Sequence, residues 1–312
     1  MMKKKIITAG LAGIALLSLA ACGTKNTSTD SNKTKEVTAL NGKVKVPETP
    51  KRVVIQNYPD EALALGSNVV GTDSWAYANP YLSADQKKGL TDLGAPSFNL
   101  QKLVGQKPDL IVTVDKTQVS DLEKVAPTVL VNYQDLGNLH KSMDYFADLL
   151  NRKDEEKAFF KKFDAEADKQ KEKLKTAGVD TSKATASILE LSGDKIYAYG
   201  DNFARGGQAL TTGLGFKESD KMAELSKGAG FAEVNAESLK AFDADWLFID
   251  YKPADAGQYK ALQANPSWKE LKAVKEGHVV VMDYNKVYFF GGPKATLAEL
   301  PLYTDAIIKV AK

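Results

Sequence analysis

The stretch LHKSMDYFADLLNRKDEEKAFFKKFDAEADKQKEKL, from Leu139 to Leu174, contains no Gly or Pro and is rich in Ala, Lys, Glu, Phe and Leu. Its apolar side chains return to one face at helical spacing, namely Phe146, Leu149, Leu150, Phe159, Phe160 and Phe163. The pattern predicts one long amphipathic helix that covers a core and ends before Gly178. We assign residues 139–177 to this helix, which divides the chain into two regions.

Short apolar strands alternate with helical segments on both sides of this helix. Pro108–Val114 is such a strand before it, and Asp245–Asp250 is one after it. Continuous apolar strands that alternate with helices indicate a parallel sheet covered on both faces. The sequence therefore predicts an α/β protein in which two Rossmann-like lobes with central sheets, at 37–138 and 178–312, are joined by one long rigid helix. Because a helix bends less easily than paired loops, we expect small relative motion of the lobes.

The N-terminus is built like an export signal, with the charged segment Met1–Lys5 followed by the apolar segment Ile6–Leu19. The order Leu, Ala, Ala, Cys that ends at Cys22 resembles the bacterial lipobox, in which the cysteine thiol receives a diacylglycerol. We predict a lipoprotein signal peptide at 1–21 and a flexible, polar tether at 22–36 that begins with the lipidated cysteine. Such a protein is anchored by lipid at the extracellular face of the cell membrane. The alternative is an ordinary cleaved signal followed by a free thiol.

Composition argues against several kinds of chemistry. The chain has 42 Lys and Arg against 40 Asp and Glu, without a basic block that would neutralise phosphates, so nucleic acid is not expected as a partner. The two histidines, His140 and His278, are far apart in the sequence, and Cys22 is the only cysteine. No motif joins a nucleophile to a base, and a transition-metal site usually needs more His or Cys ligands. We therefore expect neither an enzyme nor a metal site, although a lipid-anchored enzyme or adhesin stays as an alternative.

One loop, Ile196–Gly207, concentrates aromatic residues and glycines where a strand passes into a helix. It presents Tyr197, Phe203 and Arg205, and its paired glycines allow close approach of a backbone. The guanidinium of Arg205 suits carboxylate, hydroxamate or phosphate oxygens. The alternative is structural, with both aromatic residues in the core and Arg205 in a surface ion pair. The cluster as a whole favours binding.

Other aromatic residues also follow predicted strands. They are Tyr58, Trp75, Tyr77, Tyr133, Tyr288, Phe289 and Phe290. In open parallel sheets, ligands bind outside the carboxyl ends of the strands. Aromatic residues at these ends in both lobes predict a cleft between the lobes that holds a bulky, partly apolar ligand. For Tyr58 and Phe290 we favour a place in the core.

Several motifs together resemble the substrate-binding lipoproteins of ABC importers that have a rigid helical bridge, the siderophore and cobalamin group. The likeness extends from about Val37 to Lys312. It is carried by KPDLIVTVD (107–115), KVAPTVLVNY (124–133), YAYGDNFARGG (197–207), GAGFAEV (228–234) and LKAVKEGHVV (271–280). The glycine-rich loop of the third motif is similar to the branch that binds ferric hydroxamates such as ferrichrome and ferrioxamine.

The resemblance implies a ligand in which the siderophore already surrounds the iron(III), so the protein needs no intrinsic cofactor and no metal ligand of its own. By position, Tyr133, Tyr197, Phe203 and Arg205 match binding residues of the family, with Arg205 donating to the iron-bound hydroxamate oxygens. Either Tyr288 or Phe289 matches a further aromatic residue. We add Trp75 and Tyr77 as binding candidates on the first lobe.

The resemblance also implies partners, an ABC permease with its ATPase, and a protein that acts as a monomer. In this family a surface glutamate on each lobe meets arginines of the permease. Glu237 fits that place on the second lobe, whereas Gln101 occupies it on the first, unless the nearby Asp92 substitutes. Sibling ligands, namely a catecholate siderophore, haem or cobalamin, stay open as alternatives. The chain has only three arginines, which favours a neutral or weakly charged ligand.

Overall fold

The computed structural model describes residues 33–203, 205–287 and 289–312. The predicted signal peptide, Cys22 and most of the tether therefore lie outside the described residues. The first element is a hairpin of β1 (Thr34–Ala39) and β2 (Gly42–Pro47). Because Thr34 pairs with Pro47, residues 34–36 belong to a strand and not to the tether in which we placed them.

The first lobe contains a five-stranded sheet in the order β5-β4-β3-β6-β7, and every pairing in it is parallel. Its central strands are short apolar runs that are buried on both faces, as predicted. The strands are β3 (Val53–Ile55), β4 (Val69–Thr72), β5 (Thr91–Asp92), β6 (Leu110–Thr113) and β7 (Thr128–Leu130). The helices are α1 (Pro59–Ala64), α2 (Ser74–Tyr77), α3 (Ala84–Gly89), α4 (Leu100–Gly105) and α5 (Val119–Leu122).

The second lobe contains a mixed sheet in the order β11-β9-β8-β12-β13, with β10 beside β8. The antiparallel pairs arise because a tight turn at Gly193 folds β9 back onto β8. The strands are β8 (Thr185–Ser192), β9 (Lys195–Tyr199), β10 (Lys217–Glu218), β11 (Phe231–Val234), β12 (Trp246–Tyr251) and β13 (Val279–Asp283). The α-helices are α8 (Asp220–Ser226), α9 (Ala256–Ala264), α10 (Pro266–Lys269), α11 (Lys272–Lys275) and α12 (Pro293–Ala311), and shorter turns lie at Ala209–Gly213, Leu239–Phe242 and Pro253–Asp255.

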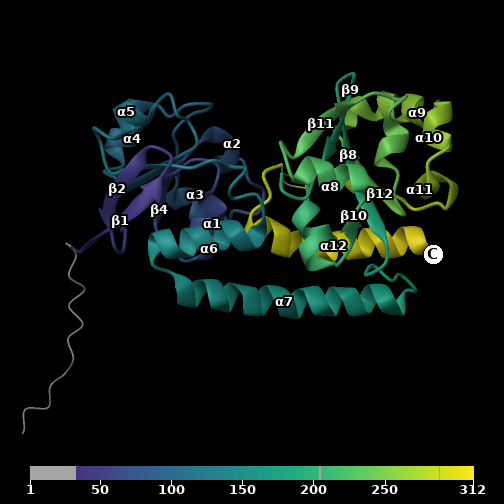
Figure 1. Cartoon of the computed structure of the whole chain (residues 1–312), viewed down its shortest axis with the longest axis horizontal. Coiled ribbons are helices and arrows are strands. Elements are labelled where there is room, and N and C mark those ends of the chain that lie inside the picture. Colours follow the sequence, from purple (N-terminus) through teal and green to yellow (C-terminus); the bar gives the residue numbers. More distant parts are fainter. Residues whose placement is uncertain (1–32, 204, 288) are drawn as a thin grey trace, which may run out of the picture. The chain divides into compact units, whose positions relative to one another are not determined.

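The bridge between the lobes is made of two helices, α6 (Leu139–Leu150) and α7 (Lys153–Thr176), so the prediction of a single helix over 139–177 was wrong in this detail. Asn151 adopts a left-handed conformation with a φ of 57°, and its N–H bonds to the carbonyls of Ala147 and Asp148. Asn tolerates this conformation better than most residues, and it ends the first helix without Gly. Helix α7 then continues as the long rigid element, beside α6 and α12 (Figure 1).

A second connection between the lobes comes from α12, which packs against α7 and against α1 of the first lobe. At its start, the Asp60 carboxylate of α1 accepts hydrogen bonds from the backbone N–H groups of Lys294 (2.8 Å) and Ala295 (3.3 Å). The Lys294 ammonium also donates to the side chain of Gln86 on α3, at 2.6 Å. The lobes are thus tied by α12 as well as by α7. No helix within the described ranges is long and apolar enough to cross a membrane.

Candidate functional site

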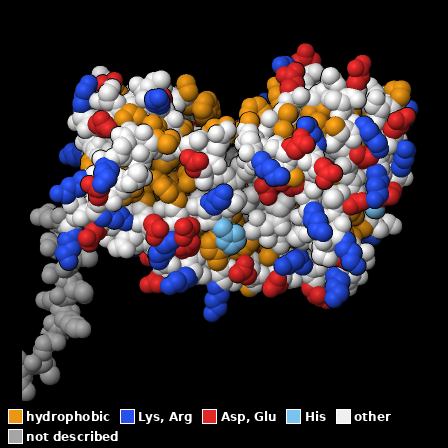
Figure 2. Space-filling model, in the orientation of Figure 1, with side chains coloured by type: hydrophobic (Ala, Val, Ile, Leu, Met, Phe, Trp, Pro, Cys, Tyr) orange, Lys and Arg blue, Asp and Glu red, His pale blue; other side chains and the backbone are white. Residues whose placement is uncertain are grey.

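A cavity of about 350 Å³ lies where the two lobes meet, and both lobes supply its walls. Tyr58 and Tyr133 reach it from the first lobe, soon after the ends of β3 and β7. Asp201, Asn202 and Phe203 reach it from the second lobe, after β9. The cavity therefore sits outside the carboxyl ends of strands, as the sequence predicted. Figure 2 shows the surface hollowed between the lobes, with hydrophobic side chains on both sides of the hollow.

Phe203 is the centre of the aromatic wall. Its ring lies 6.2 Å from that of Tyr133, edge to face, so this pair joins the two lobes across the cavity. The ring of Phe203 also lies 5.0 Å from Phe231, 5.7 Å from Tyr199 and 5.7 Å from Phe289. The pair with Tyr199 is stacked and the others are tilted or edge-on, which are favoured geometries of aromatic pairs. The cluster presents a preformed apolar surface to a ligand.

The predicted aromatic residues take different places around this wall. Tyr133 and Phe203 line the cavity. Phe289 supports the wall from behind, through Phe203 and Tyr199, and Tyr197 packs on Tyr199. Trp75 is half exposed, and its ring lies 6.5 Å from that of Phe290. The ammonium of Lys87 lies over the ring of Tyr77, 5.8 Å from its centre. Tyr288 lies outside the described residues.

Two residues that we expected in the core line the cavity instead. The ring of Tyr58 packs on Phe146 of α6 at 5.5 Å, yet the residue also borders the cavity. Phe290 borders it from the segment before α12. Sequence reasoning missed Glu61, Ser142 and Thr296, which also line it. The strand-end rule that pointed to Tyr58 applies equally to Glu61, since α1 follows β3 directly.

Arg205 lies behind the wall and does not line the cavity. Its side chain is only 3% exposed. Its Nε donates to Glu190 at 2.6 Å, its Nη1 donates to the carbonyl of Val287 at 2.9 Å, and Asp250 lies at 3.8 Å. The guanidinium also stacks over the rings of Tyr284 and Phe289. The alternative of a surface ion pair for Arg205 was therefore wrong, because the pair with Glu190 is buried. Direct contact between Arg205 and a ligand stays a prediction.

The paired glycines after Arg205 allow the chain to fold closely on itself. Gly206 has a φ of +77°, and a Cβ there would lie 2.3 Å from the buried ring of Tyr303. A Cβ on Gly207 would lie 2.6 Å from the Cα of Asp201. The Tyr303 hydroxyl donates to the carbonyl of Arg205 at 2.7 Å. The close approach that the glycines predicted is thus made by the protein itself, and it fixes the loop that carries Phe203.

The charged groups of the cavity wall are all carboxyls. Among the described lining residues, Glu61 and Asp201 are acidic and none is Lys, Arg or His. Burial raises the pKa of Glu61 to about 8, with the neighbouring Asp60 adding to the effect. Burial also raises the pKa of Asp201, whose carboxylate accepts a hydrogen bond from the Thr211 hydroxyl at 3.0 Å. The wall is therefore apolar and weakly acidic.

Comparison with known proteins decides the family. The family model described as periplasmic binding protein matches residues 59–285, which is more than half of the chain. This chain belongs to that family. Its members are binding proteins, so the expectation that the chain is not an enzyme is confirmed, as is the resemblance read from the sequence.

Three relatives illustrate the match. The iron(3+)-hydroxamate-binding protein YxeB of Bacillus subtilis is 33% identical, over 100% of this chain and 99% of the relative. The iron(3+)-hydroxamate-binding protein FhuD of the same organism is 32% identical, over 98% of each. The solved structure of FhuD2 from Staphylococcus aureus with bound ferrioxamine B is similar, with a TM-score of 0.70 and 28% identity, over 84% of this chain and all of that one. The two-lobed α/β fold that the sequence predicted is confirmed.

The candidate docking residues of this family member lie on the surface. Gln101 on α4 and Glu237 after β11 are both exposed. Asp92 is already engaged, because its carboxylate accepts hydrogen bonds from the Ser74 hydroxyl at 2.6 Å and from the N–H of Gly94 at 2.9 Å. The Asp92 carboxylate is thus less available than the side chain of Gln101 for a contact with a partner.

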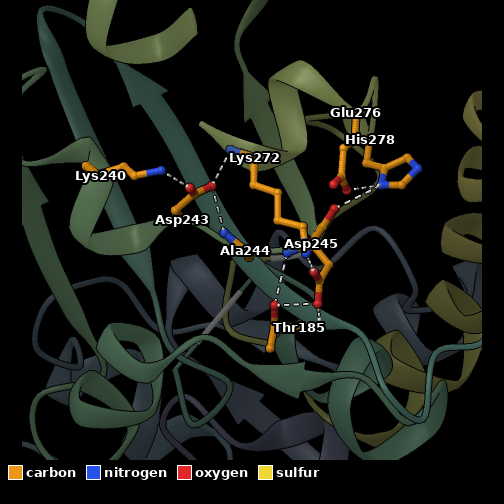
Figure 3. A network of polar contacts seen from close by, with 8 residues as sticks. All are labelled: Thr185, Lys240, Asp243, Ala244, Asp245, Lys272, Glu276 and His278. Atoms are coloured by element: carbon orange, nitrogen blue, oxygen red, sulfur yellow. Dashed lines mark hydrogen bonds and ion pairs between the residues drawn. The ribbon is translucent and has the colours of Figure 1, made fainter. Parts of the chain in front are cut away.

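Both histidines pack structurally. His278 stacks on Trp246 at 4.3 Å, and its Nδ1 lies 3.1 Å from the carbonyl of Asp245, within the polar network drawn in Figure 3. His140 stacks on Phe160 at 4.2 Å. In the part of the chain that the structure describes, no group of three or more His, Cys, Asp or Glu residues is arranged to hold a metal ion. These placements agree with the packing roles predicted from the sequence.

Proposed function

We propose that this protein captures an iron(III)-hydroxamate siderophore in the cavity between its lobes and delivers it to an ABC importer for iron uptake. The observation that carries the proposal is an aromatic cavity without a basic side chain among its described lining residues. It occurs in a chain about one third identical, over its whole length, to two proteins named for iron(3+)-hydroxamate binding.

The charge of the ligand supports this choice. Three hydroxamates neutralise iron(III), so the core of such a complex carries no net charge and buries well against aromatic rings. A ferric catecholate carries several negative charges and needs cations at its site. The described lining residues supply acids and no cation for such a ligand. The cavity therefore favours a hydroxamate over a catecholate.

We assign direct contact first to Tyr133 and Phe203, which border the cavity from opposite lobes. Trp75, Tyr77, Tyr197, Tyr288 and Phe289 are proposed as further contacts or supports. Arg205 is proposed to act by holding the Phe203 loop in place. In the structure the Nε of Arg205 donates to Glu190 and its Nη1 donates to the carbonyl of Val287, so a direct bond to hydroxamate oxygens would use the remaining guanidinium N–H groups.

Delivery is proposed to involve an ABC permease and its ATPase, with Glu237 and Gln101 as docking residues on the two lobes. Lipidation of Cys22 and the polar segment behind it would hold a monomeric protein at the extracellular face of the membrane. Tethering raises the effective concentration for docking without any added contact. Radiolabelled palmitate incorporation that is lost in Cys22→Ser tests the anchor.

Fluorescence tests the ligand. Trp75 is 50% exposed beside the cavity residue Phe290, whereas Trp246 and Trp268 are buried, at 4% and 3%. The mature protein is titrated with ferrichrome, ferrioxamine B, a ferric catecholate, haem and free iron(III). We expect saturable quenching by the hydroxamates alone, and a reduced quenching amplitude in Trp75→Phe. Quenching only by free iron, haem or the catecholate contradicts the proposal.

A further inference from the structure

The carboxyl of Glu61 lacks a countercharge. The residue is 4% exposed, lies on α1 and borders the cavity. The ion pairs found among residues 33–203, 205–287 and 289–312 do not include one to Glu61. Ser142 of α6 supplies a side-chain hydrogen bond, and Asp60 beside it is another acid. A buried carboxylate without a cation is costly, so this group is either neutral or paired when the site is occupied.

Lys294, which contacts the neighbouring Asp60, is already used elsewhere. Lys294 starts α12, and its backbone N–H and its ammonium bind Asp60 and Gln86 respectively. Burial lowers the pKa of Lys294, against the opposing attraction of Asp60. Glu61 therefore borders a cavity whose described lining residues supply no positive charge.

Asp201, the other acid of the wall, has partners of its own. Its carboxylate accepts from the Thr211 hydroxyl at 3.0 Å, and its backbone N–H donates to Glu218 at 2.9 Å. Its backbone carbonyl accepts from Gln208 at 2.7 Å. These bonds hold Asp201 in the loop that presents Phe203, so its carboxylate serves the loop. The carboxyl of Glu61 bonds to the Ser142 side chain and to its own backbone N–H, neither of which carries a positive charge.

We propose that Glu61 is a specificity residue that pairs with a primary ammonium group carried by the siderophore. The preferred cargo is then a ferric hydroxamate with a neutral iron core and a cationic amine arm. The inference rests on the proposed function and deepens it by naming the class of hydroxamate. The aromatic wall binds the neutral iron–hydroxamate core, and the Glu61 carboxylate on α1 pairs with the ammonium group of the amine arm.

The test compares two ligands that differ only in this charge. Ferrioxamine B has a primary ammonium at one end of its chain, and N-acetylation of that amine leaves the iron core unchanged. We expect the wild-type protein to bind ferrioxamine B about tenfold more tightly than its acetylated form. In Glu61→Gln the ratio of the two affinities falls to about one, while the affinity for the acetylated form changes less than about threefold. Gln has the shape of a neutral Glu, so the variant is expected to fold, which its thermal transition checks.

Asp201→Asn serves as the matched acid variant and is expected to keep the preference for the amine. Equal affinity of the wild type for the two ligands overturns the inference and leaves the proposed function intact. The inference is also overturned if Glu61→Gln keeps the preference for ferrioxamine B over its acetylated form, or if only Asp201→Asn loses that preference. If neither ligand binds the wild type, this inference is overturned, and the titration with ferrichrome decides whether the proposed function fails with it.

Discussion

The Asp60 carboxylate on α1 accepts a hydrogen bond from the backbone N–H of Lys294, the second residue of α12, at 2.8 Å. The two residues belong to different lobes and are 234 positions apart in the chain. The bond satisfies an N–H group that the start of a helix leaves without a partner. It also fixes the start of α12 next to Gly291 and Gly292, which line the cavity. The contact between the lobes and the wall of the site are therefore made by neighbouring residues of the same segment.

Loss of this bond should lower stability. Asp60→Ala removes the acceptor for two buried N–H groups, and we expect the free energy of unfolding to fall by about 1–2 kcal/mol in urea titrations. Asp60→Asn keeps an acceptor oxygen and should lose less. Asp168→Ala, on the exposed face of α7, is the control and should change stability by less than about 0.5 kcal/mol. Equal losses at Asp60 and Asp168 would contradict the role of the bond.

Stability should depend on pH through Asp250. Burial raises its pKa to about 7, against the opposing attraction of Arg205. The folded protein binds the proton of the Asp250 carboxyl more tightly than the unfolded chain does. The contribution of Asp250 to stability is therefore greatest below about pH 4 and is lost as the pH rises from about 4 to 7. Asp250→Asn should flatten that part of the curve, measured as the free energy of unfolding at each pH. Parallel curves for the two proteins would show that Asp250 does not titrate there.

Arg205 should matter for stability as well as for binding. Arg205→Ala leaves Glu190 and Asp250 buried without their cation, so we expect a loss of about 3 kcal/mol and weaker binding of ferrioxamine B, by an order of magnitude or more. Arg205→Lys keeps the charge and should lose less stability. Urea unfolding and ligand titration are measured on the same samples. Lost binding with unchanged stability would place Arg205 in direct contact with the ligand, and unchanged affinity would remove it from the site.

Gly206 should not tolerate a side chain. Gly206→Ala adds backbone strain at a positive φ and a methyl group 2.3 Å from the ring of Tyr303. Gly193→Ala is the matched control, since it has a φ of +62° and open space around its Cβ. We expect a loss of about 1 kcal/mol for Gly193→Ala and at least twice that for Gly206→Ala in urea unfolding. Similar losses would mean that the loop moves away from Tyr303 at little cost.

Local patterns predicted most of the fold because they report burial directly. The apolar runs around Leu110 and Leu247 became buried strands, and the predicted α/β lobes followed from them. The helix prediction over 139–177 failed at Asn151, because apolar spacing continues across a break that depends on a single left-handed residue. The strand at residues 34–36 was missed because it is half exposed and polar, with alternate residues facing solvent.

The site could be predicted only as far as strand ends reveal it. Tyr133 and Phe203 were found because both follow strands, and the carboxyl ends of strands border a cleft in this class of fold. The buried partners of Arg205 were not predicted, because Glu190 and Asp250 come from β8 and β12 and lie far from it in the sequence. No local sequence pattern indicates that the acids of these two strands both contact one arginine.

The sequence by itself determined the α/β class, the two lobes, the family and the aromatic character of the cavity wall. Each of these depends on short-range periodicity or on motifs that are continuous along the chain. Only the tertiary structure decided that Arg205 is buried behind the wall, that α12 is tied to Asp60, and that Glu61 faces the cavity. Those facts depend on which distant side chains meet, and charge and burial at such a meeting are set by packing rather than by neighbours in the sequence.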